Sequence, residues 1–199
     1  MSPLLLLFVG LRLGQQAVES GLSALNRGYA TDPRRLAEAG RDLGIEGAEL
    51  EKAVAYSGDR YRFGRVYGWT EVTVGLAFIS SGGLGLVEQG ARAVAGLAGL
   101  GPIAAGLAFF GIVGVLTSLF ELPFDLYDTF VIEERHGFNR QTPRGFALDR
   151  LKGMGLAIAL GGPVLAAILW IMERMGPTWW LWAWAVTTGF SVFTAWIYP

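Results

Sequence analysis

The stretch PIAAGLAFFGIVGVLTSLF, from Pro102 to Phe120, contains no charged residue and decides the class of fold. At about 1.5 Å of rise per residue, a helix of this length spans the hydrocarbon core of a bilayer, which is about 30 Å thick. Pro102 suits the first turn of that helix, because its missing N–H has no intrahelical partner there. The stretch therefore predicts a transmembrane helix.

Three further apolar stretches of similar length, at residues 66–87, 154–172 and 179–198, also predict spanning helices. Of the 199 residues, 52% are hydrophobic and 17% are charged, whereas a soluble domain carries about a quarter charged residues. Tryptophans gather at the start of the last stretch, as is typical of an aromatic belt at a membrane surface: Trp179, Trp180, Trp182 and Trp184. The composition predicts an all-α polytopic membrane protein, with residues 1–199 forming a single membrane domain.

The N-terminal segment 3–25 is apolar at first and then mixed. Its polar residues recur three or four positions apart, so they share one face of a helix: Arg12, Gln15, Gln16, Glu19 and Ser23. A polar stripe on a spanning helix faces a bundle interior or a water-filled cavity, which would make this the first of about five transmembrane helices. The alternative is an amphipathic helix that lies at the membrane surface.

Lys and Arg residues concentrate in the segments 26–65 and 121–152, whereas the segments between the other spans contain only Arg92 and Arg174. Because positive residues favour cytoplasmic loops, the N-terminus is predicted outside and the two long loops and the C-terminus in the cytoplasm. Within the first loop, Asp32 followed by Pro33 predicts a helix start, and residues 46–56 predict a short helix against the cytoplasmic face of the bundle.

Several classes of function are excluded by composition. The chain has no cysteine, which excludes disulfides, thiolate metal sites and cysteine nucleophiles. Its net charge is -1, so no basic field favours nucleic acid as a partner. The lipid bilayer is the partner that the sequence predicts directly.

The segment from Glu121 to Thr142 contains several carboxylates and His136, the one histidine of the chain. Protease zinc sites commonly use two histidines one helical turn apart, so His136 beside Glu134 is at most a fragment of such a site. The favoured alternative is that His136 forms a hydrogen bond within a packed loop. Asp125 and Asp128 form D-x-x-D, which a magnesium-dependent membrane prenyltransferase would use, but Asp149 is the one later carboxylate on that side.

A third interpretation assigns no chemistry to this segment. Its carboxylates would cap helices and pair with nearby guanidinium groups, with an architectural role: Arg135, Arg140 and Arg144. The apolar residues between them predict that the loop packs against the bundle. Gly137 is expected to supply a turn that needs a positive φ.

At these residues the chain resembles the type 1 CAAX prenyl proteases, membrane zinc metalloproteases that cleave prenylated C-terminal peptides. LPFDLYDTFVIEERHGFNRQT (residues 122–142) is similar to the family signature after the third membrane helix, and AYSGDRYRFG (residues 55–64) to the stretch before the second. Weaker similarity falls on the fourth and fifth helices: Asp149, Leu151, Lys152, Pro163, Ile197, Tyr198 and Pro199.

The resemblance implies a helical barrel around a large water-filled chamber, with the protease site on the cytoplasmic side. The family's HExxH motif follows its fifth helix, and no HExxH occurs in these residues. The resemblance therefore assigns no catalytic residue, metal ligand or cofactor to this chain; zinc belongs to the complete family protein. It implies that five residues brace the catalytic region and border the chamber: Glu133, Glu134, His136, Asn139 and Gln141.

We therefore predict the N-terminal membrane half of a CAAX prenyl protease-like zinc metalloendopeptidase, which alone neither binds zinc tightly nor cleaves peptides. We expect its catalytic region to come from a missing C-terminal part or a separate chain, and its location to be the bacterial inner membrane. A fragment of a longer or split gene product is favoured by the abrupt apolar ending. The alternative is a non-enzymatic membrane scaffold or a paralogue that binds lipid or a partner.

Overall fold

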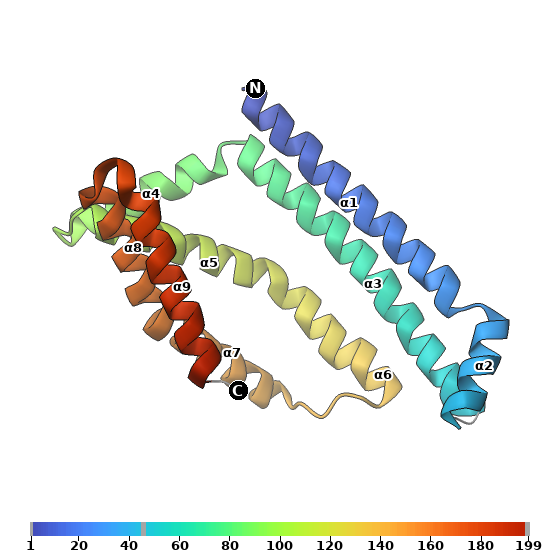
Figure 1. The fold of residues 1–199 in the computed structure, drawn as a ribbon. Coiled ribbons are helices and arrows are strands. Elements are labelled where there is room, and N and C mark those ends of the chain that lie inside the picture. The colour runs from blue at the N-terminus through green and yellow to red at the C-terminus, as the bar shows by residue number, and fades with distance from the viewer. Residues whose placement is uncertain (1, 45–46, 198–199) are drawn as a thin grey trace. The chain divides into compact units, whose positions relative to one another are not determined.

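The computed structural model describes residues 2–44 and 47–197, and within these ranges no residue lies in a β-strand. The predicted all-helical class is confirmed for this part of the chain. Glu46, Tyr198 and Pro199, which belong to predicted elements or motifs, lie outside the described residues. In chain order (Figure 1), the elements are α1 (Pro3–Ala30), α2 (Pro33–Leu43), α3 (Gly47–Ser80), α4 (Gly83–Leu97), α5 (Pro102–Tyr127), the π-helical η1 (Asp128–Glu133), α6 (Glu134–His136), α7 (Pro143–Leu156), the π-helical η2 (Ala157–Gly161), α8 (Gly162–Arg174), the 3-10 turn η3 (Gly176–Thr178) and α9 (Trp179–Ile197).

The helices form two compact units. The first contains the chain up to Leu84 together with Leu119–Arg140, and the second contains Gly85–Ser118 together with the chain from Gln141 onward. The candidate bracing residues up to Asn139 belong to the first unit, so that unit carries most of the argument below.

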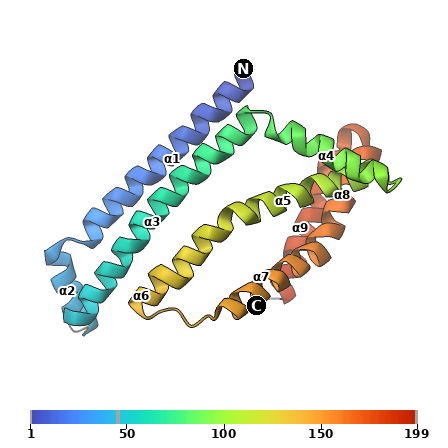
Figure 2. The same cartoon turned by 180° about the vertical axis from the view of Figure 1, so that it is seen from behind.

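In the first unit, α1 and α3 lie side by side and run in opposite directions (Figures 1 and 2). Two residues of the predicted polar stripe of α1, Arg12 and Gln16, face α3. Arg12 Nη2 lies 3.1 Å from Glu71 Oε1, and Gln16 is only 7% exposed. Gln15, Glu19 and Ser23 of the same stripe are exposed, so α3 covers only part of it.

Two glycines of α3 let α1 approach closely. A Cβ atom on Gly68 would lie 2.8 Å from Gln16 Nε2, and one on Gly58 would lie 3.2 Å from Arg27 Nη1. The Arg27 guanidinium also lies over the Tyr61 ring, 4.9 Å from its centroid. Small residues at helix contacts allow this close approach, which brings the polar ends of long side chains onto the neighbouring helix.

The segment 26–65, predicted as a loop, is mostly helical. Asp32 is the N-cap of α2, and its side chain accepts a hydrogen bond from the Arg34 N–H at 2.9 Å, as predicted. Gly44, with φ +63°, ends α2. From Gly47 onward, the short helix predicted at 46–56 is instead the first part of α3, because no proline separates it from the apolar run that follows.

The span predicted at residues 66–87 is not one continuous helix. α3 ends at Ser80 and α4 begins at Gly83, with a bend of 66° between them. Gly82 adopts φ +84°, and a Cβ atom on Gly83 would lie 2.5 Å from the Phe78 ring. The turn therefore depends on the two consecutive glycines, which hydropathy alone averages into the apolar run.

The segment 121–152, predicted as a cytoplasmic loop, is helical for most of its length. The helix that begins at Pro102 continues past the first charged residues to His136, and a new helix begins at Pro143. Leu, Glu and Arg residues after Phe120 favour helix, so the charges change the surface of the helix without ending it. Likewise, the span predicted at 154–172 begins earlier, whereas α9 agrees closely with the prediction at 179–198.

In the second unit, α8 packs against α9, and a Cβ atom on Gly106 of α5 would lie 2.8 Å from Leu169 Cδ1 of α8. The π-helical η2 immediately precedes α8, whose first turn contains Pro163. Proline removes an N–H and crowds the carbonyl four residues earlier, and a π-helical turn relieves that crowding.

By length and composition, Pro102–His136 and Pro143–Arg174 are each able to cross a membrane. The bent pair α3 and α4 adds a third span if it is counted as one. Large apolar side chains on α5, α8 and α9 are exposed, for example Phe110, Trp170 and Phe193. Such surfaces suit contact with lipid tails or with further helices.

The close contact between α1 and α3 yields a test on matched glycines. Gly68→Leu places a side chain where Gln16 lies and should lower the free energy of unfolding by about 1–3 kcal/mol, as overpacking does. Gly75→Leu is the control, because its Cβ position in the same helix has no atom within 4 Å. Thermal unfolding in detergent compares the two; equal unfolding temperatures would contradict this account of the helix pair.

Candidate functional site

The segment after η1 is shaped by a tight helix end. Gly137 adopts φ +77°, so the turn predicted there is confirmed. The N–H of Gly137 donates to the Glu134 carbonyl at 3.1 Å, and the N–H of Phe138 donates to the Glu133 carbonyl at 2.8 Å. These bonds satisfy carbonyl groups that a helix terminus leaves free, which fixes the direction of the chain after His136.

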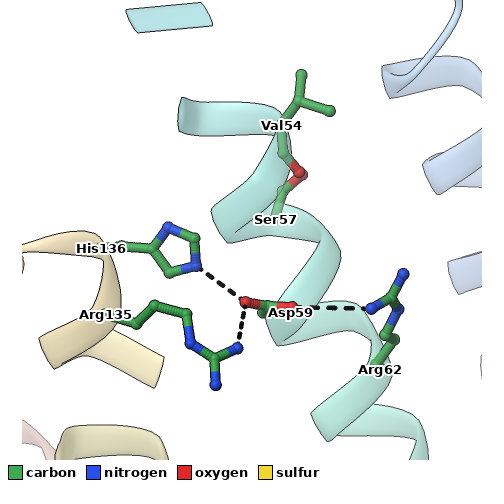
Figure 3. Close-up of polar contacts among 6 residues, drawn as sticks. All are labelled: Val54, Ser57, Asp59, Arg62, Arg135 and His136. Atoms are coloured by element: carbon green, nitrogen blue, oxygen red, sulfur yellow. Dashed lines mark hydrogen bonds and ion pairs between the residues drawn. The ribbon is translucent and has the colours of Figure 1, made fainter. Parts of the chain in front are cut away.

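His136 sits just before this turn and points at α3 (Figure 3). Its side chain is 8% exposed, and Nε2 lies 3.0 Å from Oδ2 of Asp59. The Tyr56 ring meets the imidazole edge-on with centroids 5.3 Å apart, and the Phe138 ring lies 4.7 Å from Tyr56. The hydrogen bond predicted for His136 is therefore present, but it joins the end of a helix to α3 rather than closing a loop on itself.

Asp59 is the centre of this contact. Its Oδ2 accepts a hydrogen bond from Arg135 Nη1 at 3.1 Å, and Arg62 Nη1 lies 4.0 Å from Oδ1 (Figure 3). The side chain of Asp59 is 22% exposed. The hydrogen bond to His136, with the bond and charge of Arg135, lowers the pKa of Asp59 below its ordinary value of 3.8, against a smaller opposing effect of burial.

One residue along, Arg60 forms a second set of contacts with the same segment. Its Nη1 lies 3.2 Å from Asp128 Oδ2 and 3.6 Å from Glu133 Oε1, and it donates to the Tyr56 hydroxyl at 3.1 Å. The Tyr56 hydrogen bond and these carboxylates raise the pKa of Arg60. α3 thus holds η1 and α6 through one carboxylate and one guanidinium that are adjacent in sequence.

The expected pairing inside the segment 121–152 is corrected here. Arg135 binds Asp59, and the carboxylates of Asp128 and Glu133 bind Arg60, so in each case the partner lies on α3. The prediction missed this because the intervening residues were read as a loop, whereas the helical path of 128–136 turns these side chains toward α3.

The five predicted bracing residues divide between the two units. Glu133, Glu134, His136 and Asn139 lie together, with Asn139 Nδ2 donating to Glu134 Oε2 at 2.9 Å. Gln141 belongs to the second unit, where its Nε2 donates to Asp149 Oδ2 at 3.0 Å. The structure therefore gives each of these residues a local contact, and their role in a catalytic assembly stays a prediction.

The donor set does not fit a zinc site. Across residues 2–44 and 47–197, no three His, Cys, Asp or Glu side chains are placed to hold a metal ion together. His136 is engaged with Asp59, and the chain has no cysteine. The D-x-x-D pair does not form a magnesium site either, since Asp128 faces the Arg60 guanidinium.

Comparison with known proteins decides the family. A family model described as CAAX prenyl protease N-terminal, five membrane helices, matches residues 33–199. The chain belongs to this family. The resemblance found in the sequence is confirmed, and the protein is an integral membrane protein in contact with the lipid bilayer.

Among its relatives, the CAAX prenyl protease 1 homolog of Arabidopsis thaliana is 37% identical over 158 residues, which cover 78% of this chain and 37% of that protein. The Homo sapiens homolog is 31% identical over 157 residues, 77% of this chain and 33% of that one. The crystal structure of S. mikatae Ste24p has the same fold, with a TM-score of 0.83 at 23% identity. The match covers 98% of this chain and 45% of the Ste24p chain. The chain spans roughly a third of the length of these two curated relatives.

Sequence reasoning missed Asp59, Arg60 and Tyr56 as members of the site. They lie in AYSGDRYRFG, the second stretch with family resemblance, and the signal was an acidic residue directly followed by arginine beside an aromatic residue. Four residues of this stretch share one side of α3: Tyr56, Asp59, Arg60 and Phe63. That side faces the end of α5, η1 and α6.

The contact between Asp59 and His136 predicts energetic coupling. Asp59→Asn and His136→Gln should each lower the unfolding temperature, and the double variant should lose less than the sum of the two, because both changes remove one shared interaction. Glu88→Gln, which removes an exposed pair within α4, should have little effect. Additive losses at positions 59 and 136 would contradict the contact.

The lowered pKa of Asp59 predicts how this stabilisation depends on pH. A carboxyl group whose pKa is lower in the folded state stabilises that state above its ordinary pKa and loses the effect as pH falls through the folded value. The difference in unfolding temperature between the wild type and Asp59→Asn should therefore be present at neutral pH and shrink as pH falls below 3.8. Measurement at stepped pH checks this; a difference that grows with acidity would oppose it.

Proposed function

We propose that this chain provides the N-terminal membrane part of a CAAX prenyl protease-like zinc metalloendopeptidase, lining part of an intramembrane chamber and bracing the catalytic region. Five spans, with the N-terminus outside and the two Lys- and Arg-rich segments in the cytoplasm, are part of the proposal. The catalytic zinc site comes from polypeptide outside these 199 residues. The location in a bacterial inner membrane stays a prediction, since the relatives compared above are from a plant and a human.

The observation that carries the bracing role is the contact of Arg135 and His136 with Asp59. It joins the turn at Gly137 to α3, so the segment that follows the helix is held by a charged and partly buried contact. Surface ion pairs contribute little to stability, whereas a hydrogen-bonded group of three at a helix end restricts direction as well. That restriction is what a neighbouring catalytic region would require.

Family membership favours this function over a non-enzymatic membrane scaffold, and no separate observation supports the prenyltransferase. The contacts of the carboxylates also suit a structural role better than a catalytic one. Each carboxylate discussed here is engaged with a guanidinium, an imidazole or an amide, which leaves the group to position neighbouring chain.

The proposal is tested by a chimera in which this chain replaces the matching N-terminal part of the Arabidopsis thaliana relative. The chimera should cleave a farnesylated peptide with a C-terminal CAAX sequence, and a zinc chelator should abolish the cleavage. Asp59→Asn should lower turnover while the zinc content stays equal, and Glu88→Gln should match the parent chimera. Full turnover in Asp59→Asn would contradict bracing by this contact.

The 199-residue chain alone supplies the complementary result. Purified from membranes, it should contain less than one zinc ion per chain by elemental analysis and should not cleave the same peptide. Stoichiometric zinc together with chelator-sensitive cleavage by the chain alone would contradict the assignment of catalysis to other polypeptide.

A further inference from the structure

A cavity of about 530 Å³ lies in the first unit beside the Asp59 contact. Its volume falls within the range of about 300–1,000 Å³ that ligand sites occupy. Most of its wall is apolar and comes from α3 and α5: Phe63, Val66, Pro123, Phe124 and Tyr127. No bracing contact described above fills this space, and its size and lining are suitable for a ligand.

The apolar wall is held by ring contacts of its own. Phe63 stacks on Tyr127 with centroids 5.6 Å apart, and Phe124 lies 6.3 Å from Phe63. The Tyr67 ring supports Phe124 from outside the cavity, at 5.0 Å in an edge-on arrangement. Because these aromatic residues pack against one another, the wall keeps its shape without a ligand.

Among the residues that line the cavity, the positively charged groups outnumber the negatively charged ones. Two guanidinium groups, of Arg62 and Arg135, share the single carboxylate of Asp59. Arg135 is held at 3.1 Å, whereas Arg62 is 77% exposed and lies 4.0 Å from the nearer Asp59 oxygen. Arg62 is therefore the residue that is able to turn toward an anion and bind it with both arms of its guanidinium group.

The sequence places this cavity where the apolar runs end, with Val66 at the start of the run on α3 and Pro123, Phe124 and Tyr127 just beyond the end of the run on α5. Along α3, the charged residues through Arg65 give way to an apolar run at Val66, and along α5 the uncharged run ends at Phe120. Along α3, Phe63 and Val66 of the apolar wall therefore lie nearer the apolar run, where acyl chains lie in a bilayer. Arg62 of the rim lies further from that run, where headgroups lie. Basic pockets between membrane helices bind anionic headgroups in this position.

We propose that this cavity binds an anionic phospholipid, with the phosphate group on Arg62 and Arg135 and an acyl chain along Phe63, Val66 and Tyr127. The proposal rests on the lining of the cavity and does not depend on the proposed protease function. One bound lipid would fill the space between α3 and the end of α5 and neutralise the excess charge beside Asp59.

The test uses the 199-residue chain in nanodiscs of phosphatidylglycerol and phosphatidylcholine in equal amounts, extracted into mild detergent. Mass spectrometry of the purified protein measures the lipid that stays bound. The wild type should retain phosphatidylglycerol in preference to phosphatidylcholine. Arg62→Gln should lower this retention about fivefold to tenfold, because it removes a charge-assisted contact to phosphate.

Two further variants and one competitor make the result specific. Val66→Trp fills the apolar part of the cavity and should also lower retention, whereas Arg92→Gln, an arginine on α4 that is 73% exposed, should leave it unchanged. Circular dichroism establishes that each variant keeps its helical content. Excess inorganic phosphate should not displace the lipid, since phosphate lacks the acyl chain.

Equal retention of both lipids by the wild type, no retained lipid, or unchanged retention in Arg62→Gln and Val66→Trp would each overturn the proposal. Displacement by inorganic phosphate would also overturn it and would assign the rim to a small anion. Because the readout is bound lipid, the result is independent of whether the chimera described above cleaves its peptide.

Discussion

In the first unit, the carboxylate of Asp59 sets how the helix that ends at His136 meets α3. It lies on α3, accepts a hydrogen bond from Arg135 and lies 3.0 Å from the imidazole of His136, which is buried. Few side chains are buried in the part of the chain that the structure describes, and Val72, Ala91 and Ile132 are among the most enclosed. With so little apolar core, a hydrogen-bonded ionic group has an unusually large share in setting how the helix that ends at His136 meets α3.

The helices themselves were largely predictable, and their ends were not. Apolar runs located α5, α8 and α9, because the bilayer demands about 20 apolar residues per span. The first charge after Phe120 marks the edge of that apolar layer, but the helix continues to His136 because Leu, Glu and Arg also favour helix. Hydropathy likewise hid the bend at Gly82, where two glycines interrupt a run that is apolar on average.

The candidate site was predictable as a segment and not as a set of contacts. The residues around His136 identified the family, and Gly137 was correctly expected to adopt positive φ. Asp59, which contacts Arg135 and His136, lies more than seventy residues earlier, and Arg60 is the residue after it. A single sequence gives no measure of which distant residues meet, so the pairing of 128–136 with α3 required the folded chain.

Hydrogen exchange at the amides of Gly137, Phe138 and Asn139 tests the central claim most directly. These N–H groups bond to the Glu133 and Glu134 carbonyls, and the account holds that Asp59 keeps this turn in place. They should exchange slowly in the wild type and clearly faster in Asp59→Asn, while amides within α9 exchange equally in both. Equal protection of the turn in the two proteins would contradict the claim that Asp59 holds it.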